Sequence, residues 1–186
     1  MKRIWALCAV MLLLTGCAGQ NDPLAPGLAL REQLLGAAGC GFTAEVTADY
    51  GDKTYTFTMD CTGDGDGNME FTVTAPDTIQ GIRGVVSGDG GRLTFDGKAL
   101  AFSLLADGEV TPVSAPWLLL RALRGGYLRS GGTSGEMYCL TVDDSYQEDA
   151  LRLEVWLDGQ NLPVRAEAVW QGRRILSISV ENFAFL

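Results

Sequence analysis

The feature of this sequence that most limits its fold is a two-residue period of apolar side chains along three consecutive segments. Between residues 40 and 50 the even positions are apolar, and the odd positions are mostly polar. The parity inverts between 54 and 61, and residues 69–75 keep the inverted parity. This alternation is typical of β-strands that bury one face. The three segments therefore predict an antiparallel sheet with one continuous apolar face and one threonine-rich polar face.

Turn residues fix how these and later strands pair. Gly51-Asp52 favours a register in which Phe42 lies opposite Cys61. Asp96-Gly97 predicts a hairpin that pairs Leu93 with Leu100, and Gln171-Gly172 predicts the last hairpin. We interpret the Gly/Ser-rich residues 131–135 as a linker. The further strands predicted are 79–87, 92–95, 98–104, 137–142, 151–157, 164–170 and 174–181.

Two segments have the spacing of helices instead. Residues 28–38 place leucines at helical intervals, and Gly39 follows as a stop signal. The second helix is predicted to begin after Ser114 as its N-cap and to end at Gly125-Gly126. Between 117 and 124 only two arginines are polar, so this helix should be buried almost all round.

The N-terminus has the pattern of an exported protein. Two basic residues precede an apolar run that ends at Leu14, which is too short to remain as a membrane-spanning helix. Residues 14–17, Leu-Thr-Gly-Cys, resemble the bacterial lipobox, in which the chain is cut before a cysteine that receives a lipid. We therefore expect a signal peptide at 1–16, a lipidated tether at 17–27 that begins with Cys17, and one domain at 28–186. The alternative is a secreted protein in which Cys17 is incidental.

Net charge and composition limit the classes of partner and ligand that the protein can bind. Without the signal peptide the chain has 12 basic and 23 acidic residues, a net charge of −11. Such a chain should repel nucleic acid, so we expect no nucleic-acid partner and a ligand that is neutral, cationic or apolar. We also expect a monomer. Histidine is absent, which removes the usual general base and the commonest metal ligand.

Three cysteines remain once Cys8 and Cys17 are set aside. They are Cys40, Cys61 and Cys139, and an odd number leaves at least one unpaired within the chain. A slip that places Tyr50-Gly51 in the first turn would bring Cys40 and Cys61 face to face. A disulfide between them therefore stays an alternative to two buried free thiols.

No residue pattern indicates catalysis. Asp64, Asp66 and Asn68 alternate as in a calcium loop, but the twelfth position of that loop is Ala75, and the run lies between predicted strands. A hairpin turn is the better interpretation. Cys139 has no histidine to activate it, and no phosphate-binding glycine motif is present. We expect a protein without enzymatic activity, metal or cofactor.

Two stretches resemble a known family. "PVSAPWLLLRAL" (112–123) and "LEVWLDGQNLPVRAEAVWQGRRILSISVENFAF" (153–185), in this order of elements, resemble the LolA/LolB-like lipoprotein-carrier superfamily, which includes the LppX/LprG and RseB types. The resemblance implies an α+β fold, an incomplete antiparallel half-barrel of about 10–11 strands with helices plugging its concave face. It also implies an apolar cavity for acyl chains and supplies no catalytic residue.

These observations lead to one functional hypothesis and its rivals. We expect a lipoprotein anchored on the extracytoplasmic side of a bacterial membrane, in the cell envelope, that binds an acyl chain, a lipid or a lipidated protein. The alternatives are an RseB-like sensor or interaction protein with a filled cavity, and a structural envelope component. A vacant cavity on the order of several hundred Å3 would favour a ligand, and a packed interior would favour protein contact. The expected ligand-binding residues are Phe42, Val46, Tyr55, Phe57, Met59, Phe71, Val73, Trp117 and Leu120.

Overall fold

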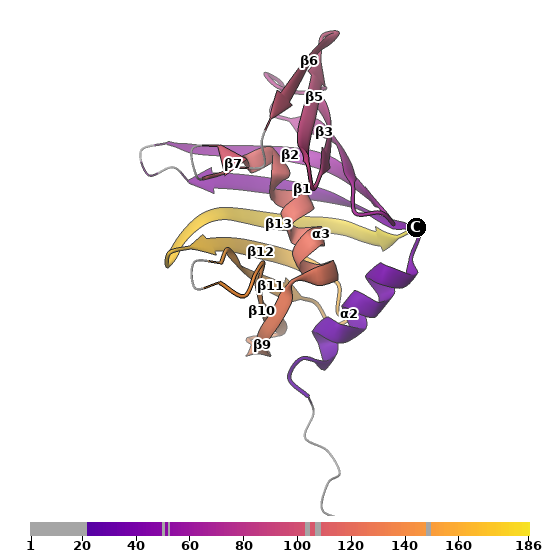
Figure 1. The fold of residues 1–186 in the computed structure, drawn as a ribbon, viewed down its shortest axis with the longest axis vertical. Helices are drawn as coiled ribbons and strands as arrows, with labels where there is room; N and C mark the ends of the chain where they lie inside the picture. The colour runs from indigo at the N-terminus through magenta and orange to yellow at the C-terminus, as the bar shows by residue number, and fades with distance from the viewer. Residues whose placement is uncertain (1–21, 50, 52, 103–104, 107–108, 148–149) are drawn as a thin grey trace, which may run out of the picture.

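The computed structural model describes residues 22–49, 51, 53–102, 105–106, 109–147 and 150–186. Within these residues the chain forms one open antiparallel sheet of 11 strands, in the order β6-β5-β4-β3-β2-β1-β13-β12-β11-β10-β9. Two helices lie on one side of this sheet, and α3 crosses it (Figure 1). This is the predicted half-barrel with helices on its concave face. We call the face toward the helices the inner face and the opposite one the outer face.

The element bounds are as follows. The helices are α2 (Ala25–Gly36), the short 3-10 helix η1 (Pro112–Ser114) and α3 (Ala115–Gly125). The sheet strands are β1 (Gly39–Asp49), β2 (Thr54–Asp64), β3 (Met69–Ala75), β4 (Arg83–Ser87), β5 (Gly90–Phe95), β6 (Lys98–Phe102), β9 (Tyr127–Ser134), β10 (Met137–Asp143), β11 (Arg152–Leu157), β12 (Pro163–Trp170) and β13 (Arg173–Phe185). The strands β7 (Leu105–Ala106) and β8 (Glu109–Val110) form a separate pair.

The registers follow the turn chemistry of the sequence. Phe42 lies opposite Cys61, and Leu93 lies opposite Leu100, as predicted. Asp96 and Gln171 adopt positive φ at the two predicted hairpin turns, each followed by a glycine with positive φ. The last strand, β13, then pairs with the first, β1, in the middle of the sheet. This pairing of the two ends of the chain brings the N-terminal and C-terminal strands into one continuous apolar inner face.

The inner face is covered by α3, which is apolar almost all round as predicted. Its buried residues include Trp117, Leu119 and Leu123, and they belong to the same core as the strand residues. Ser114 occupies the N-cap position, but its hydroxyl donates to the carbonyl of Thr111 (2.6 Å) and not to the helix. At the other end Arg31 of α2 donates to the carbonyls of Leu123 and Gly126, both at 2.7 Å. A side chain of one helix thus satisfies the carbonyl groups at the C-terminus of the other.

Three predicted boundaries are wrong: both ends of the first helix and the start of the strand at 79–87. Helix α2 begins earlier than expected, at Ala25. It ends at Gly36, because Gly39 already belongs to β1, where its carbonyl accepts from the N–H of Leu186 (2.9 Å). Residues 79–82 form turns and not a strand, because the N–H groups of Ile79 and Ile82 bond to carbonyls within the same loop. The strand expected at 79–87 is therefore only β4.

The largest correction concerns the expected linker at 131–135. Residues 127–134 form β9, which pairs with β10 at the edge of the sheet. At Gly131 a Cβ atom would lie 2.2 Å from the carbonyl oxygen of Pro23, so the glycine there permits a close approach of the N-terminal segment. The composition predicted a linker, whereas the segment is a paired strand in which Gly131 permits close packing.

The predicted signal peptide and Cys17 lie outside the described residues. Of the expected tether, Ala25–Gly27 form the first residues of α2. The helices in the described part of the chain are all too short or too polar to span a membrane.

Candidate functional site

The residues expected to bind a ligand lie on the inner face, and nearly all of them are inaccessible. Eight of the nine are between 0 and 8% exposed: Phe42, Val46, Phe57, Met59, Phe71, Val73, Trp117 and Leu120. Tyr55 is the exception, 51% exposed near the start of β2. The structure therefore brings the predicted residues together as the core and leaves Tyr55 apart from them.

Phe57, Met59, Phe71 and Trp117, four of the nine residues expected to bind a ligand, do not line one common hollow in the described part of the chain. Met59 is 0% exposed, and Phe57 is also buried. Trp117 lines a hollow of about 350 Å3 beside the start of β3, and Phe71 lines a different hollow of about 810 Å3. Helix α3 thus occupies the space in which an acyl chain was expected.

The acidic turn between β2 and β3 holds this helix in place. The carbonyls of Asp64 and Gly65 accept from the guanidinium of Arg124, and the carbonyl of Gly67 accepts from the indole N–H of Trp117 (2.9 Å). The carboxylate of Asp64 accepts from the side chain and the backbone N–H of Asn68, and these bonds lower its pKa. The hairpin turn is confirmed, and its carbonyl oxygens bind side chains of α3.

Cys40 and Cys61 are free thiols, and both are buried on the inner face of the sheet. In the observed register Cys40 lies opposite Gly63, so the slipped register and its face-to-face disulfide are wrong. Burial raises the pKa of both thiols. Cys139 lies on the outer face, where partial burial and then the carboxylates of Glu154 and Glu167 raise its pKa.

The inner face continues past the helices onto the β5–β6 hairpin, where it is uncovered. Leu93 and Phe102 pack partly against the core. Toward the tip, Phe95 is 49% exposed and Leu100 is 64% exposed. Register places these four side chains on the same face, because Leu93 pairs with Leu100 and Phe95 pairs with Lys98. The hairpin lies at the end of the molecule opposite the start of α2 (Figure 1).

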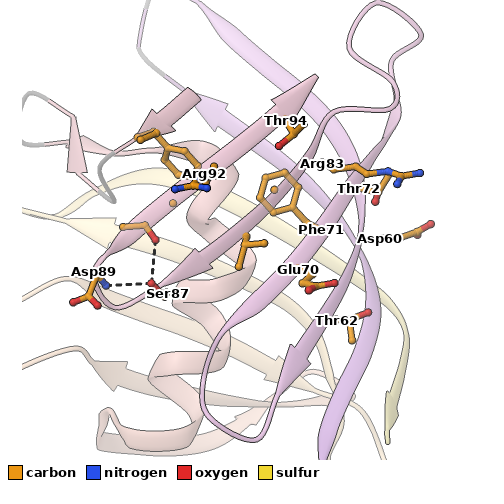
Figure 2. Close-up of a pocket in the computed structure, with 16 residues that line it drawn as sticks. Asp60, Thr62, Glu70, Phe71, Thr72, Arg83, Ser87, Asp89, Arg92 and Thr94 are labelled. Atoms are coloured by element: carbon orange, nitrogen blue, oxygen red, sulfur yellow. Dashed lines mark hydrogen bonds between the residues drawn. The ribbon is translucent and has the colours of Figure 1, made fainter. Parts of the chain in front are cut away.

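The outer face of the same strands has a hollow of about 810 Å3, lined by residues of β2 to β6 (Figure 2). Its side chains form two rows across the sheet. One row runs Glu70, Val85, Arg92, and the other runs Asp60, Thr72, Arg83. In both rows the carboxylate and the arginine are two strands apart, about 9–10 Å. The hollow therefore has an acidic flank on β2 and β3 and a basic flank on β4 and β5.

Glycines let the sheet take this shape. A Cβ atom at Gly84 would lie 2.4 Å from the ring of Phe71, and one at Gly91 would lie 2.1 Å from the ring of Phe102. Each phenylalanine thus covers the glycine opposite it on the neighbouring strand. Glycines in strand interiors are typical of bends in a sheet. This hollow was not predicted from the sequence, although the glycines at 84, 90 and 91 and the charged outward positions are visible signals of it.

The outer face of β9 to β13 is arranged differently. The carboxylate of Asp143, which is buried, accepts from Arg129 (2.8 Å) and Arg152 (3.0 Å). Glu167, also buried, lies between Arg165 and Arg174 in the same way. Burial alone would raise the pKa of Asp143, but the hydrogen bonds from its two arginines outweigh burial and lower it. The four ion pairs in the described part of the chain are all in this half.

Comparison with known proteins bears on the fold. No protein-family model matches the chain, and no curated protein matches its sequence. Similar solved structures include a LolA superfamily protein from Nitrosomonas europaea, with 10% identity over 86% of this chain and 93% of that chain and a TM-score of 0.45. The lipoprotein LppX from Mycobacterium tuberculosis has 13% identity over 89% and 96%, with a TM-score of 0.44.

A third similar structure is the complex of the CwlD amidase with the GerS lipoprotein from Clostridioides difficile. The matched chain has 11% identity over 91% of this chain and 99% of that chain, with a TM-score of 0.44. A LolA superfamily protein and LppX thus stand among the similar structures, as the sequence resemblance predicted. At identities this low the similarity concerns the fold alone.

Proposed function

We propose that the protein is a lipoprotein of the bacterial cell envelope, anchored through Cys17 on the extracytoplasmic side of a membrane, that binds another polypeptide. The observation that carries this proposal is the filled inner face. An acyl chain between α3 and the sheet would have to displace side chains such as Met59 and Trp117, which are 0% and 3% exposed. It would also break the bonds of α3 to the β2–β3 turn. The accessible features are on the outer face and at the β5–β6 hairpin.

A second candidate function is supported by the exposed part of the inner face. Phe95 and Leu100 present apolar surface to water on a hairpin whose neighbouring residues Leu93 and Phe102 pack against the core. Exposed apolar surface of this kind marks sites of contact with partners or lipid. The acyl chain of a lipid or of a lipidated protein would be sheltered there, at the rim, and not among the mid-sheet residues first expected to hold it.

Photo-crosslinking separates the two candidates. A photoreactive amino acid is placed at Leu100, and in separate variants at outer-face positions Val85 and Thr94, in the full-length protein in the cells that express it. We expect a discrete higher-mass protein adduct from at least one outer-face position and no lipid adduct from Leu100. A lipid adduct at Leu100 without any protein adduct would replace the first function by the second. Tyr146 on the opposite half, which is 88% exposed, is a matched accessible control.

The anchor has its own test. Replacing Cys17 by serine should move the protein from the membrane fraction to the soluble fraction, because lipidated cysteines hold such proteins on the bilayer. The described helices supply no alternative span. A Cys17→Ser protein that stays in the membrane pellet after a salt wash would contradict the proposed anchor.

A further inference from the structure

We infer that the hollow on the outer face of β2 to β6 is the docking site for an extended polypeptide segment that has a basic, an apolar and an acidic side chain at alternate positions. This inference rests on the proposed function, since it names the surface and the chemistry of the protein partner. The residues that define the site are Asp60 and Glu70 on the acidic flank, Arg83 and Arg92 on the basic flank, and Val85 between them.

The charged groups of the hollow are only partly used within the chain, because the carboxylate of Asp60 accepts from the hydroxyl of Thr43 (3.0 Å). Asp60, Glu70, Arg83 and Arg92 form no ion pair with any residue that the structure describes. This is not a general property of the outer face, because the buried carboxylates of β10 and β12 are each held by two arginines. In the hollow, register places each carboxylate two strands away from the arginine of its own row. Glu70 is diagonal to Arg83 on the neighbouring strand, but the two form no ion pair. These four side chains are therefore available for ion pairs with a partner.

The separation of the two flanks determines the kind of partner. A lone phosphate or carboxylate would meet Arg83 and Arg92 but would leave both carboxylates of the acidic flank unpaired. A cation alone would leave the arginines unpaired. The occupant therefore needs both signs, about 9–10 Å apart across the strands. In an extended polypeptide, a basic and an acidic residue four positions apart lie on one face about 13–14 Å apart, and their long side chains can lean inward to the two flanks.

The floor of the hollow fits the middle of such a segment. Val85 is 46% exposed, and register places it directly between Glu70 and Arg92. Thr72, in the same position of the other row, offers a hydroxyl. The hollow is also lined by Thr94 and Ala101, small residues that leave the arginines accessible from the side of β6. An apolar side chain of the partner would contact Val85 while its charged neighbours reach the two flanks.

Synthetic peptides test the charge pattern directly. Three 12-residue peptides share one sequence except for a central Lys-Ser-Val-Ser-Glu, Lys-Ser-Val-Ser-Lys or Glu-Ser-Val-Ser-Glu. Each is titrated at low salt into the full-length Cys17→Ser protein, and binding is followed by amide chemical-shift changes. We expect the mixed-charge peptide to bind at least tenfold more tightly than the other two, with the largest shifts on β3 to β5. Equal affinities, or binding of none of the peptides, would overturn the inference.

Charge reversal provides the decisive comparison. In the double variant Arg83→Glu/Arg92→Glu both flanks are acidic, so the mixed-charge peptide should lose at least tenfold in affinity and the Lys/Lys peptide should become the best ligand. The control Lys53→Glu/Arg173→Glu makes the same change in net charge at two exposed positions outside the hollow and should leave the order of the peptides unchanged. If both double variants change the peptide affinities in the same way, the affinities depend only on net charge, and the proposed site is wrong.

Failure of this inference is distinguishable from failure of the proposed function. A protein adduct from Leu100, which does not line the hollow, combined with peptides that do not bind at the hollow, would keep the function and remove this site. A lipid adduct from Leu100 with no protein adduct at any position would remove both.

Discussion

The two ends of the sheet treat outward charges in opposite ways. On β10 and β12 the carboxylates of Asp143 and Glu167 are buried, and each accepts bonds from two arginines. On β2 to β5 the carboxylates and arginines are exposed around a hollow and form no ion pair with described residues. The charged groups are of the same kind, but at one end they form ion pairs that contribute to the fold, and at the other they form none. We propose that the second set is available to a partner.

The largest expected effect on stability tests whether the two ends of the sheet are stabilised by the same core. Trp117→Ala should destabilise the protein by about 3–5 kcal/mol, because a buried tryptophan of α3 is truncated. Its neighbour Arg121 lies over the Trp117 ring, and Arg121→Ala should cost about 0.5 kcal/mol or less beyond the lost ring contact. Urea denaturation measures both. Equal midpoints, or separate transitions for the two ends, would show that α3 does not join them.

The next largest effect on stability is expected at the buried, ion-paired carboxylates of β10 and β12. Asp143→Ala should cost about 1–3 kcal/mol, because a buried acceptor of two charged hydrogen bonds is removed. Glu70→Ala on the hollow is the matched control and should stay within about 0.5 kcal/mol. If Glu70→Ala is as destabilising as Asp143→Ala, the charges of the two ends do not differ in role.

The pH dependence of stability should show the same difference. The pKa of Asp143 is lower in the folded chain than in the unfolded chain, where it is about 4. Its contribution to stability is therefore complete above the unfolded value and is lost as the pH falls through the lowered folded value. The gap in urea midpoint between wild type and Asp143→Asn should shrink from pH 6 to pH 3. A gap that is constant or grows toward acid would contradict this account.

The smallest expected effect is at the hollow itself. Arg83→Ala and Arg92→Ala should each change the free energy of unfolding by no more than about 0.5 kcal/mol, since both side chains are exposed and unpaired with described residues. The same variants should weaken binding of the mixed-charge peptide. A loss of stability above about 1 kcal/mol would mean that these arginines belong to the fold and not to a site.

Much of the fold could be predicted from local pattern. Alternation located the first three strands, and the dipeptides at 96–97 and 171–172 fixed two hairpins, because turn geometry and side-chain parity are local properties. The buried character of α3 also followed from its composition. The strand at 127–134 was missed because its glycines resemble a linker, whereas the segment pairs with β10 and Gly131 lies against the carbonyl of Pro23.

The candidate site was less predictable. The inner-face residues were identified correctly as one apolar surface, yet whether that surface holds a ligand or a helix depends on how α3 packs, which no single segment encodes. The charged hollow arises from residues of β2 to β5, between positions 60 and 92, that become neighbours through three successive pairings. Sequence alone shows their parity but not which charge lies beside which.

The sequence by itself therefore determined the antiparallel sheet, its apolar face and the second helix, since each depends on spacing within a few residues. Tertiary structure decided the rest. It closed the inner face with α3, placed β13 beside β1, kept Cys40 and Cys61 apart as free thiols, and paired the charges of one end while separating those of the other. The physical reason is that cross-strand neighbours are set by register over the whole sheet, and register is a property of all the turns together.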